Sequence, residues 1–265
     1  MELQRNLDAI RRGGLGLAAI SYDAPDVLRA FADKYGIQYP LLSDAGSATI
    51  GRYGILNAAA TGAAAGIPHP GTFVVDSKGR VVARFFEAAY QERYTAATIL
   101  AALERPDDSG RKTTSVRTPH VEIRTSASDE VVAPGERFGL VIDVAPKPTM
   151  RVYAPGQTGY IPVSLALEPD GDYTAHPIAF PPAEDYLFAP LNERVKVYGK
   201  PFRLVQELTV SLSRELRERA AAGATLTIRG TLRYQACDDK MCYVPAQAPL
   251  EWTVKLKRLE TPERR

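Results

Sequence analysis

The sequence predicts two domains of different fold class, an α/β layer fold followed by an all-β sandwich. Residues 1–104 alternate helical and strand patterns, as expected of helices packed on a small sheet. Residues 105–119 have almost no apolar content, which is typical of a linker. Residues 120–260 contain short alternating runs separated by turn dipeptides such as Pro134-Gly135, which is typical of a β-sandwich. The length of 265 residues fits two domains.

The first domain is predicted to begin with a helix at residues 2–12, where apolar side chains recur near helical spacing. Residues 15–21 form the continuous apolar run of a buried parallel strand. An amphipathic helix at 25–35 ends at Gly36. The later predicted elements are an extended piece at 39–42, a short helix at 47–53, a loop at 57–66, a hairpin with strands at 72–76 and 81–86, and a helix at 94–104.

In the second domain, runs with strand periodicity recur between turn signals. The predicted strands lie at 121–124, 137–144, 151–153, 163–167, 202–211, 224–234 and 249–256. Residues 213–222 are the one predicted helix, with charges on a solvated face. Prolines at 177, 181, 182 and 190 indicate a long irregular loop that lies over the last hairpin as a lid.

The composition excludes some classes of partner. With 45% hydrophobic and 24% charged residues the chain is an ordinary globular protein. Its net charge of +2 is too small to indicate nucleic acid or an anionic membrane surface as a partner. No apolar run reaches the roughly 18 residues of a spanning helix, so no membrane span is expected in this chain. Residues 1–5 lack the basic and then apolar pattern of a signal peptide.

The only two cysteines, Cys237 and Cys242, are separated by four residues and lie between two alternating runs. This spacing predicts a hairpin tip with the two side chains opposed, at the roughly 4.5–5.5 Å Cβ separation from which a disulfide forms by a small adjustment. Closing so short a loop gains little chain entropy, so a purely stabilising disulfide is the weaker explanation. The residues favour a redox-active pair and leave open a structural disulfide, buried inert thiols or a shared metal ion.

This interpretation requires no cofactor and no metal. Two cysteines do not complete a four-ligand zinc site, and the three histidines, at 69, 120 and 176, show no ligand spacing relative to them. Asp238 and Asp239 disfavour a neighbouring thiolate whereas Lys240 favours it, so the residues do not decide which cysteine attacks.

The run GTLRYQACDDKMCYVP, residues 230–245, resembles the active-site hairpin of the amino-terminal periplasmic domain in the thiol:disulfide interchange protein DsbD family. Residues 197–200, VYGK, are similar to the family's cap loop, and residues 150–156 to the strand that contributes active-site tyrosines. The resemblance implies an immunoglobulin-like sandwich, a periplasmic or other extracytoplasmic location, and partners that are other thiol/disulfide redox proteins. It also implies that Cys242 forms the mixed disulfide and that Cys237 resolves it.

Tyrosines near the cysteines are expected to shield the pair and to shape a groove for the partner. We expect Tyr153, Tyr198 and Tyr234 in this role. The chain departs from the family at the cap, where Val197 replaces an aromatic residue and the two residues before it replace acidic ones. The loop between the cysteines is also one residue shorter. These departures bear on the cap mechanism and on the choice of partner.

Residues 1–104 contain GLAAISYDAPDVLRAFADKYGIQYPLLSD and GIPHPGTFVVDSKGRVV, and they are similar to the alkyl hydroperoxide reductase/thiol-specific antioxidant family, the peroxiredoxins. The resemblance implies a thioredoxin-like fold whose opening strand and cysteine-bearing turn would precede residue 1. No cysteine lies in residues 1–236. Pro70 lies where thioredoxin-like folds often carry a cis-proline, with His69 beside it as a proton carrier. An ordinary turn proline and a solvated histidine are the alternatives.

We therefore expect a thiol:disulfide oxidoreductase that passes electrons through the pair of Cys237 and Cys242. Residues 1–104 are then either a scaffold or a truncated domain, and truncation is favoured because a missing strand leaves a sheet edge unpaired. One alternative is a peroxiredoxin-type antioxidant peroxidase whose peroxidatic cysteine lies upstream of this chain. The other is a non-enzymatic binding module with a structural disulfide.

Overall fold

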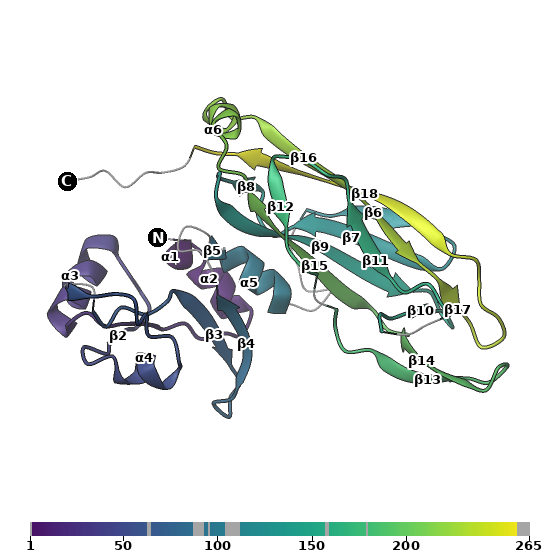
Figure 1. Ribbon diagram of the computed structural model, residues 1–265, viewed down its shortest axis with the longest axis horizontal. Helices are drawn as coiled ribbons and strands as arrows, with labels where there is room; N and C mark the ends of the chain where they lie inside the picture. The colour runs from purple at the N-terminus through teal and green to yellow at the C-terminus, as the bar shows by residue number, and fades with distance from the viewer. Residues whose placement is uncertain are drawn as a thin grey trace. The chain divides into compact units, whose positions relative to one another are not determined.

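Figure 1 shows the computed structural model, which describes residues 2–62, 65–86, 93–94, 96–103, 112–156, 159–178 and 180–258. The chain is mostly β-sheet with a few helices, and it divides into two compact units, Met1–Leu100 and Ala101–Arg265. Within the described ranges, no helix has the length and apolar character needed to cross a membrane.

The amino-terminal unit carries most of the helices. Its elements are α1 (Glu2–Arg5), α2 (Leu7–Arg12), β1 (Ala19–Ser21), α3 (Pro25–Tyr35), β2 (Leu41–Ser43), α4 (Ala48–Arg52), β3 (Gly71–Val75), β4 (Val81–Phe86) and β5 (Arg93–Tyr94), and α5 (Ala96–Leu103) spans the boundary between the units. β1 pairs in parallel with β2, and β3 pairs antiparallel with β4. These elements follow the order that the sequence predicts, except that the first helix is divided into α1 and α2 and that β5 was not predicted.

Two elements of this unit show how local sequence sets the structure. Helix α3 begins with Pro25 in its first turn and ends at Gly36, whose φ of 61° is the left-handed conformation that glycine adopts without strain. The strand predicted at residues 15–21 is wrong in extent and burial, because β1 covers only its last three residues and Ile20 is 41% exposed. In the described part of the chain β1 pairs with β2 alone, so nothing encloses it as a central strand.

The carboxy-terminal unit is built from strands. Its elements are β6 (Thr114–Arg117), β7 (Val121–Ala127), β8 (Val131–Val132), β9 (Glu136–Pro146), β10 (Arg151–Tyr153), β11 (Ser164–Leu167), β12 (Tyr173–Ala175), β13 (Glu184–Phe188), β14 (Glu193–Tyr198), β15 (Phe202–Val210), α6 (Arg214–Ala221), β16 (Thr225–Tyr234), β17 (Ala236–Cys237) and β18 (Ala246–Leu256). Helix α6 begins where the Ser213 side chain accepts a hydrogen bond from the Leu216 N–H.

Two sheets of this unit share one hydrophobic core. One contains the strands in the order β12-β15-β9-β7-β6 and the other in the order β11-β16-β18-β8, as Figure 1 shows. Alternate residues of β9, such as Leu140 and Ile142, pack in the same cluster as alternate residues of β16 and β18, such as Ile228 and Trp252. Gly230 lets β11 approach β16, since a Cβ there would lie 2.9 Å from the Ala166 carbonyl oxygen.

A third sheet, in the order β13-β14-β10-β17, positions the cysteines. Val152 of β10 lies opposite Tyr198 of β14 on one side and opposite Ala236 of β17 on the other. All three residues pack into the main core. Tyr153 lies one residue further along β10, so its side chain emerges on the other face of the sheet. There it belongs to a separate cluster that contains Cys237.

Two predictions about irregular segments are wrong. The predicted linker at 105–119 contains β6, which pairs with β7; residues 105–111 of that linker lie outside the described residues. The predicted lid loop contains the hairpin of β13 and β14, in register from Glu184 opposite Val197 to Phe188 opposite Glu193. β6 and β13 are edge strands, and neither shows a clean alternation of apolar and polar residues, because β6 has one apolar residue and β13 begins with two adjacent acidic ones.

A buried ion pair joins two central strands of the larger sheet. Asp143 of β9 lies directly opposite Arg203 of β15. The guanidinium donates from Nε to one carboxylate oxygen at 2.6 Å and from Nη2 to the other at 2.8 Å, and each side chain is only 7% exposed. This two-pronged geometry compensates the cost of removing both charges from water.

Candidate functional site

Cys237 and Cys242 face each other across an antiparallel bridge, as the sequence predicts. The flanking hydrogen bonds run from the Asp238 N–H to the Met241 carbonyl at 3.0 Å and from the Tyr243 N–H to the Ala236 carbonyl at 2.9 Å. The cysteines are therefore a non-hydrogen-bonded pair, the type in which opposite Cα atoms lie closest, at about 4.5 Å. Both are free thiols in this structure, placed where a disulfide forms with little backbone movement.

Gln235 directs the chain from one sheet to another just before the first cysteine. β16 pairs with β18 as far as Tyr234 opposite Ala246, and the next strand, β17, pairs with β10 instead. The Gln235 side chain spans this break, accepting the Ile161 N–H at 2.9 Å and donating to the Tyr243 carbonyl at 3.0 Å. Its amide therefore ties the segment after Cys242 to the segment before Cys237.

The two thiols differ in access. The Cys237 side chain is fully buried, and this burial raises the pKa of its thiol above the ordinary value. Cys242 is half-buried. Of the two sulfurs, Cys242 is therefore the more accessible one.

Tyr153 covers the pair and contacts the accessible sulfur. Its hydroxyl lies 3.1 Å from Cys242 Sγ, and its ring stacks on Tyr160 with centroids 4.2 Å apart. Tyr160 in turn donates its hydroxyl to the Glu193 carboxylate, and this hydrogen bond raises the pKa of Tyr160 to about 12. Burial raises the pKa of Tyr153 as well, so both phenols remain protonated at neutral pH and Tyr153 can donate to a sulfur anion.

Replacing Tyr153 by phenylalanine is expected to slow alkylation of Cys242 at pH 7 by roughly tenfold. The ring and its stacking remain, but the thiolate loses a charge-assisted hydrogen bond of about 1.5–3 kcal/mol. Mass spectrometry of the reduced protein during iodoacetamide treatment measures this rate. Tyr160→Phe is the matched control, since it loses a hydroxyl that donates to the Glu193 carboxylate. Equal alkylation rates in Tyr153→Phe and the unmodified protein would show that the hydroxyl does not stabilise the thiolate.

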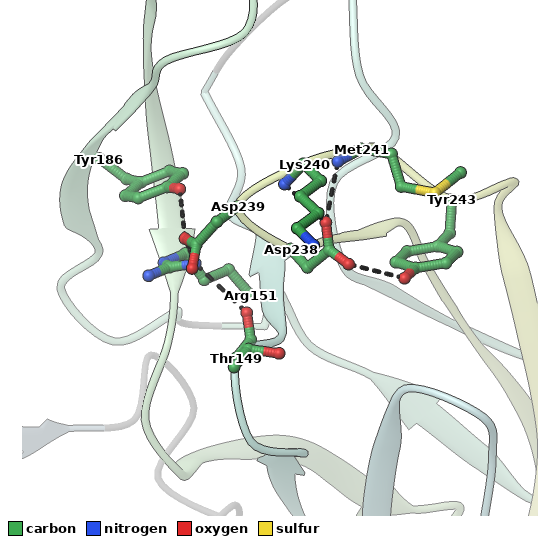
Figure 2. Close-up of polar contacts among 8 residues, drawn as sticks. All are labelled: Thr149, Arg151, Tyr186, Asp238, Asp239, Lys240, Met241 and Tyr243. Atoms are coloured by element: carbon green, nitrogen blue, oxygen red, sulfur yellow. Dashed lines mark hydrogen bonds and ion pairs between the residues drawn. The ribbon is translucent and has the colours of Figure 1, made fainter.

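The loop between the cysteines is anchored to β10 and β13 through Asp239 (Figure 2). Its carboxylate accepts the Tyr186 hydroxyl at 2.8 Å and pairs with the Arg151 guanidinium at 2.8 Å. The guanidinium also lies over the Tyr186 ring, 4.0 Å from its centroid. The Tyr186 hydrogen bond and the Arg151 charge hold the pKa of Asp239 below its usual range, so this carboxylate is ionised and paired at neutral pH.

Asp238 closes the loop internally, and its side chain lies on the opposite side of the loop from Asp239 (Figure 2). It accepts the backbone N–H groups of Met241 and Lys240 and the Tyr243 hydroxyl, each at 2.8 Å. These hydrogen bonds hold the pKa of Asp238 below its usual range. Asp238 and Asp239 were expected from the sequence to disfavour a nearby thiolate. In the structure Asp238 is hydrogen-bonded to loop amides and a hydroxyl, and Asp239 to a hydroxyl and a guanidinium.

The structure brings only some of the predicted shielding residues to the cysteines. Tyr153 and Val197 belong to the cluster around Cys237. Tyr198 and Tyr234 pack in the main core instead, so their expected role in shielding is corrected. The reason is strand alternation, because Tyr198 follows Val197 on β14 and therefore projects from the opposite face.

The predicted loop at His69 and Pro70 belongs to the amino-terminal unit. No peptide bond in the described residues is cis, so the cis-proline is corrected to an ordinary trans one. The His69 N–H donates to the Ile55 carbonyl at 2.7 Å, and its side chain is exposed. Backbone pairing of this segment with residue 55 explains its position without a catalytic role.

Several site residues were missed by reasoning from the sequence. Arg151 had a signal, since it lies two residues before Tyr153 on a strand and so shares its face. Gln235 also had a sequence signal, because it is a polar residue between the end of the alternating run and the first cysteine. Tyr186 had none, because its strand was interpreted as a loop.

In the part of the chain that the structure describes, no group of three or more acidic, histidine or cysteine side chains is placed to hold a metal ion.

Comparison with known proteins gives one family match and a low-identity structural similarity. The model of the AhpC/TSA family matches residues 1–84. Among solved structures, the chain is similar to the N-terminal periplasmic domain of ScsB from Proteus mirabilis, with 14% sequence identity, a TM-score of 0.38, and coverage of 56% of this chain and 52% of that one. No curated protein matches the chain. The amino-terminal unit is thus similar to the AhpC/TSA family over residues 1–84, and this family implies a thioredoxin-like fold and a thiol-dependent redox function.

Proposed function

We propose that the carboxy-terminal unit is a thiol:disulfide exchange module that uses Cys237 and Cys242 as its dithiol. The observation that carries this proposal is the non-hydrogen-bonded bridge between one buried and one accessible cysteine. Residues 1–236 contain no cysteine, so the thiol chemistry of the sequence given belongs to this pair. The hairpin resemblance further supports an immunoglobulin-like sandwich for this unit and a location outside the cytoplasm.

The reaction takes two exchanges. The Cys242 thiolate attacks one sulfur of a partner disulfide, forming a Cys242–partner disulfide and releasing the other partner sulfur as a thiolate. Cys237 then loses its proton and attacks Cys242 Sγ, which forms the Cys237–Cys242 disulfide and releases the second partner thiolate. Two electrons pass to the partner, and the released thiolates take up protons from solvent. The Tyr153 hydroxyl stabilises the Cys242 thiolate that begins the first exchange.

Equilibration in graded glutathione buffers is expected to give a reduction potential of roughly −270 to −120 mV for the pair, the range of exchange proteins. The free thiols at each ratio are trapped by alkylation and counted by mass spectrometry. A potential well below about −300 mV would identify a structural disulfide instead and would contradict the proposed function.

A further inference from the structure

The backbone around Cys242 leaves one edge of the site unpaired. Tyr243 directs its N–H to the Ala236 carbonyl, and its own carbonyl accepts the Gln235 side chain. In an extended segment, the N–H and C=O groups of successive residues point to opposite sides. Those of Cys242 and Val244 therefore point away from β17. Neither residue has a backbone hydrogen bond within the part of the chain that the structure describes.

This edge is accessible as well as unpaired. The Val244 side chain is 82% exposed and that of Met241 is 52% exposed, so the residues flanking Cys242 and Tyr243 have open apolar surface. Pro245 has no N–H and therefore limits pairing to the short stretch before it. An edge of this kind accepts one short extended segment and resists pairing over a longer length.

We infer that the partner in disulfide exchange docks as an added strand along Met241–Val244, pairing its backbone with the free N–H and C=O groups of Cys242 and Val244. The occupant is an extended peptide segment that carries the disulfide to be reduced. This inference rests on the proposed function, and it adds how the partner is recognised. Backbone pairing supplies affinity with little demand on side-chain identity, so the edge suits many disulfide-containing segments.

Strand addition also explains how the sulfurs meet. The outward N–H and C=O of Cys242 fit a hydrogen-bonded antiparallel pair, in which the opposite residue has its Cα about 5.5 Å away and its side chain on the same face. A partner cysteine at that place presents its sulfur beside Cys242 Sγ. The attack then forms the bond between these two sulfurs and breaks the partner's own S–S bond.

Two peptides with differently placed N-methyl groups test the pairing. Each is a linear peptide whose single cysteine is disulfide-bonded to thionitrobenzoate, and the release of this coloured thiol by the reduced full-length protein gives the rate. One peptide is N-methylated at its cysteine and at residues two positions away, the other at the adjacent residues. Because the partner cysteine lies in a hydrogen-bonded pair with Cys242, methylation of the set that includes the cysteine is expected to slow the reaction about fivefold for each hydrogen bond lost, and methylation of the adjacent residues to have little effect. Equal rates for both peptides and the unmethylated one would overturn the inference.

Variants at Val244 test the same edge from the protein side. Val244→Pro removes the outward N–H, whereas Val244→Ala keeps it and removes only the side chain. The proline variant is expected to react about fivefold more slowly than the alanine variant with the unmethylated peptide, and at the same rate with dithiobis(nitrobenzoate), which has no peptide backbone. Equal peptide rates in the two variants would contradict strand addition. A protein that reduces neither the peptide nor the small disulfide would instead reject the proposed function.

Discussion

Replacing Cys242 by serine is expected to abolish disulfide exchange, whereas replacing Cys237 by serine is expected to stop the reaction at its first stage. In Cys237→Ser the accessible thiol still attacks, but no second thiol resolves the product, so a mixed disulfide accumulates. In Cys242→Ser the remaining thiol is fully buried and has a pKa raised by that burial. Intact-mass measurement after incubation with oxidised glutathione distinguishes the two: one adduct per chain for the first variant and essentially none for the second.

The order of attack depends on this comparison. Adduct formation in Cys242→Ser as fast as in Cys237→Ser would show that the buried sulfur is equally reachable, and would remove the basis for assigning Cys242 as the attacking residue. Unfolding the Cys242→Ser variant in denaturant gives the matched control. Its single thiol must then react, because burial no longer protects it, and this confirms that the thiol was intact.

Local sequence patterns predicted much of the fold because they act over a few residues. The helix at residues 25–35 was predicted with the bounds that the structure gives, since Pro25 and Gly36 set its ends by their own backbone preferences. The strands β16 and β18 were predicted from their alternation. The opposition of Cys237 and Cys242 was predicted from the four residues between them. In each case the signal lies within one element or one turn.

The parts of the site that were missed depend on contacts between distant segments. Asp239 pairs with Arg151 across 88 positions of sequence, and no local pattern encodes this pairing. The main-core position of Tyr198 follows from the register of β14 against β10, which places Val197 toward the cysteines instead. The strand that carries Tyr186 was missed because it begins with two adjacent acidic residues and shows no clean alternation. Tertiary pairing rather than propensity therefore assembled this site.

Replacing Asp143 by alanine is expected to lower the free energy of unfolding by about 3–5 kcal/mol, the largest stability effect that we predict. The change leaves Arg203 with its charge buried and without its two-pronged carboxylate partner, since both side chains are only 7% exposed. Denaturant unfolding followed by circular dichroism measures the loss as a lower midpoint with little change in slope. A decrease below about 1 kcal/mol would mean that water or other groups solvate the guanidinium as well as the carboxylate does.

The double variant Asp143→Leu with Arg203→Met separates the effect of the ion pair from that of a buried charge that has lost its oppositely charged partner. Its side chains fill similar volume and bury no charge, so it is expected to recover most of the stability that Asp143→Ala loses. The single variant Arg203→Met leaves a buried carboxylate alone and is expected to be as unstable as Asp143→Ala. A double variant as unstable, relative to the unmodified protein, as either single variant would show that the pair itself stabilises the fold. Recovery in the double variant would instead show that the pair between β9 and β15 adds little net stability over apolar side chains at the same register positions.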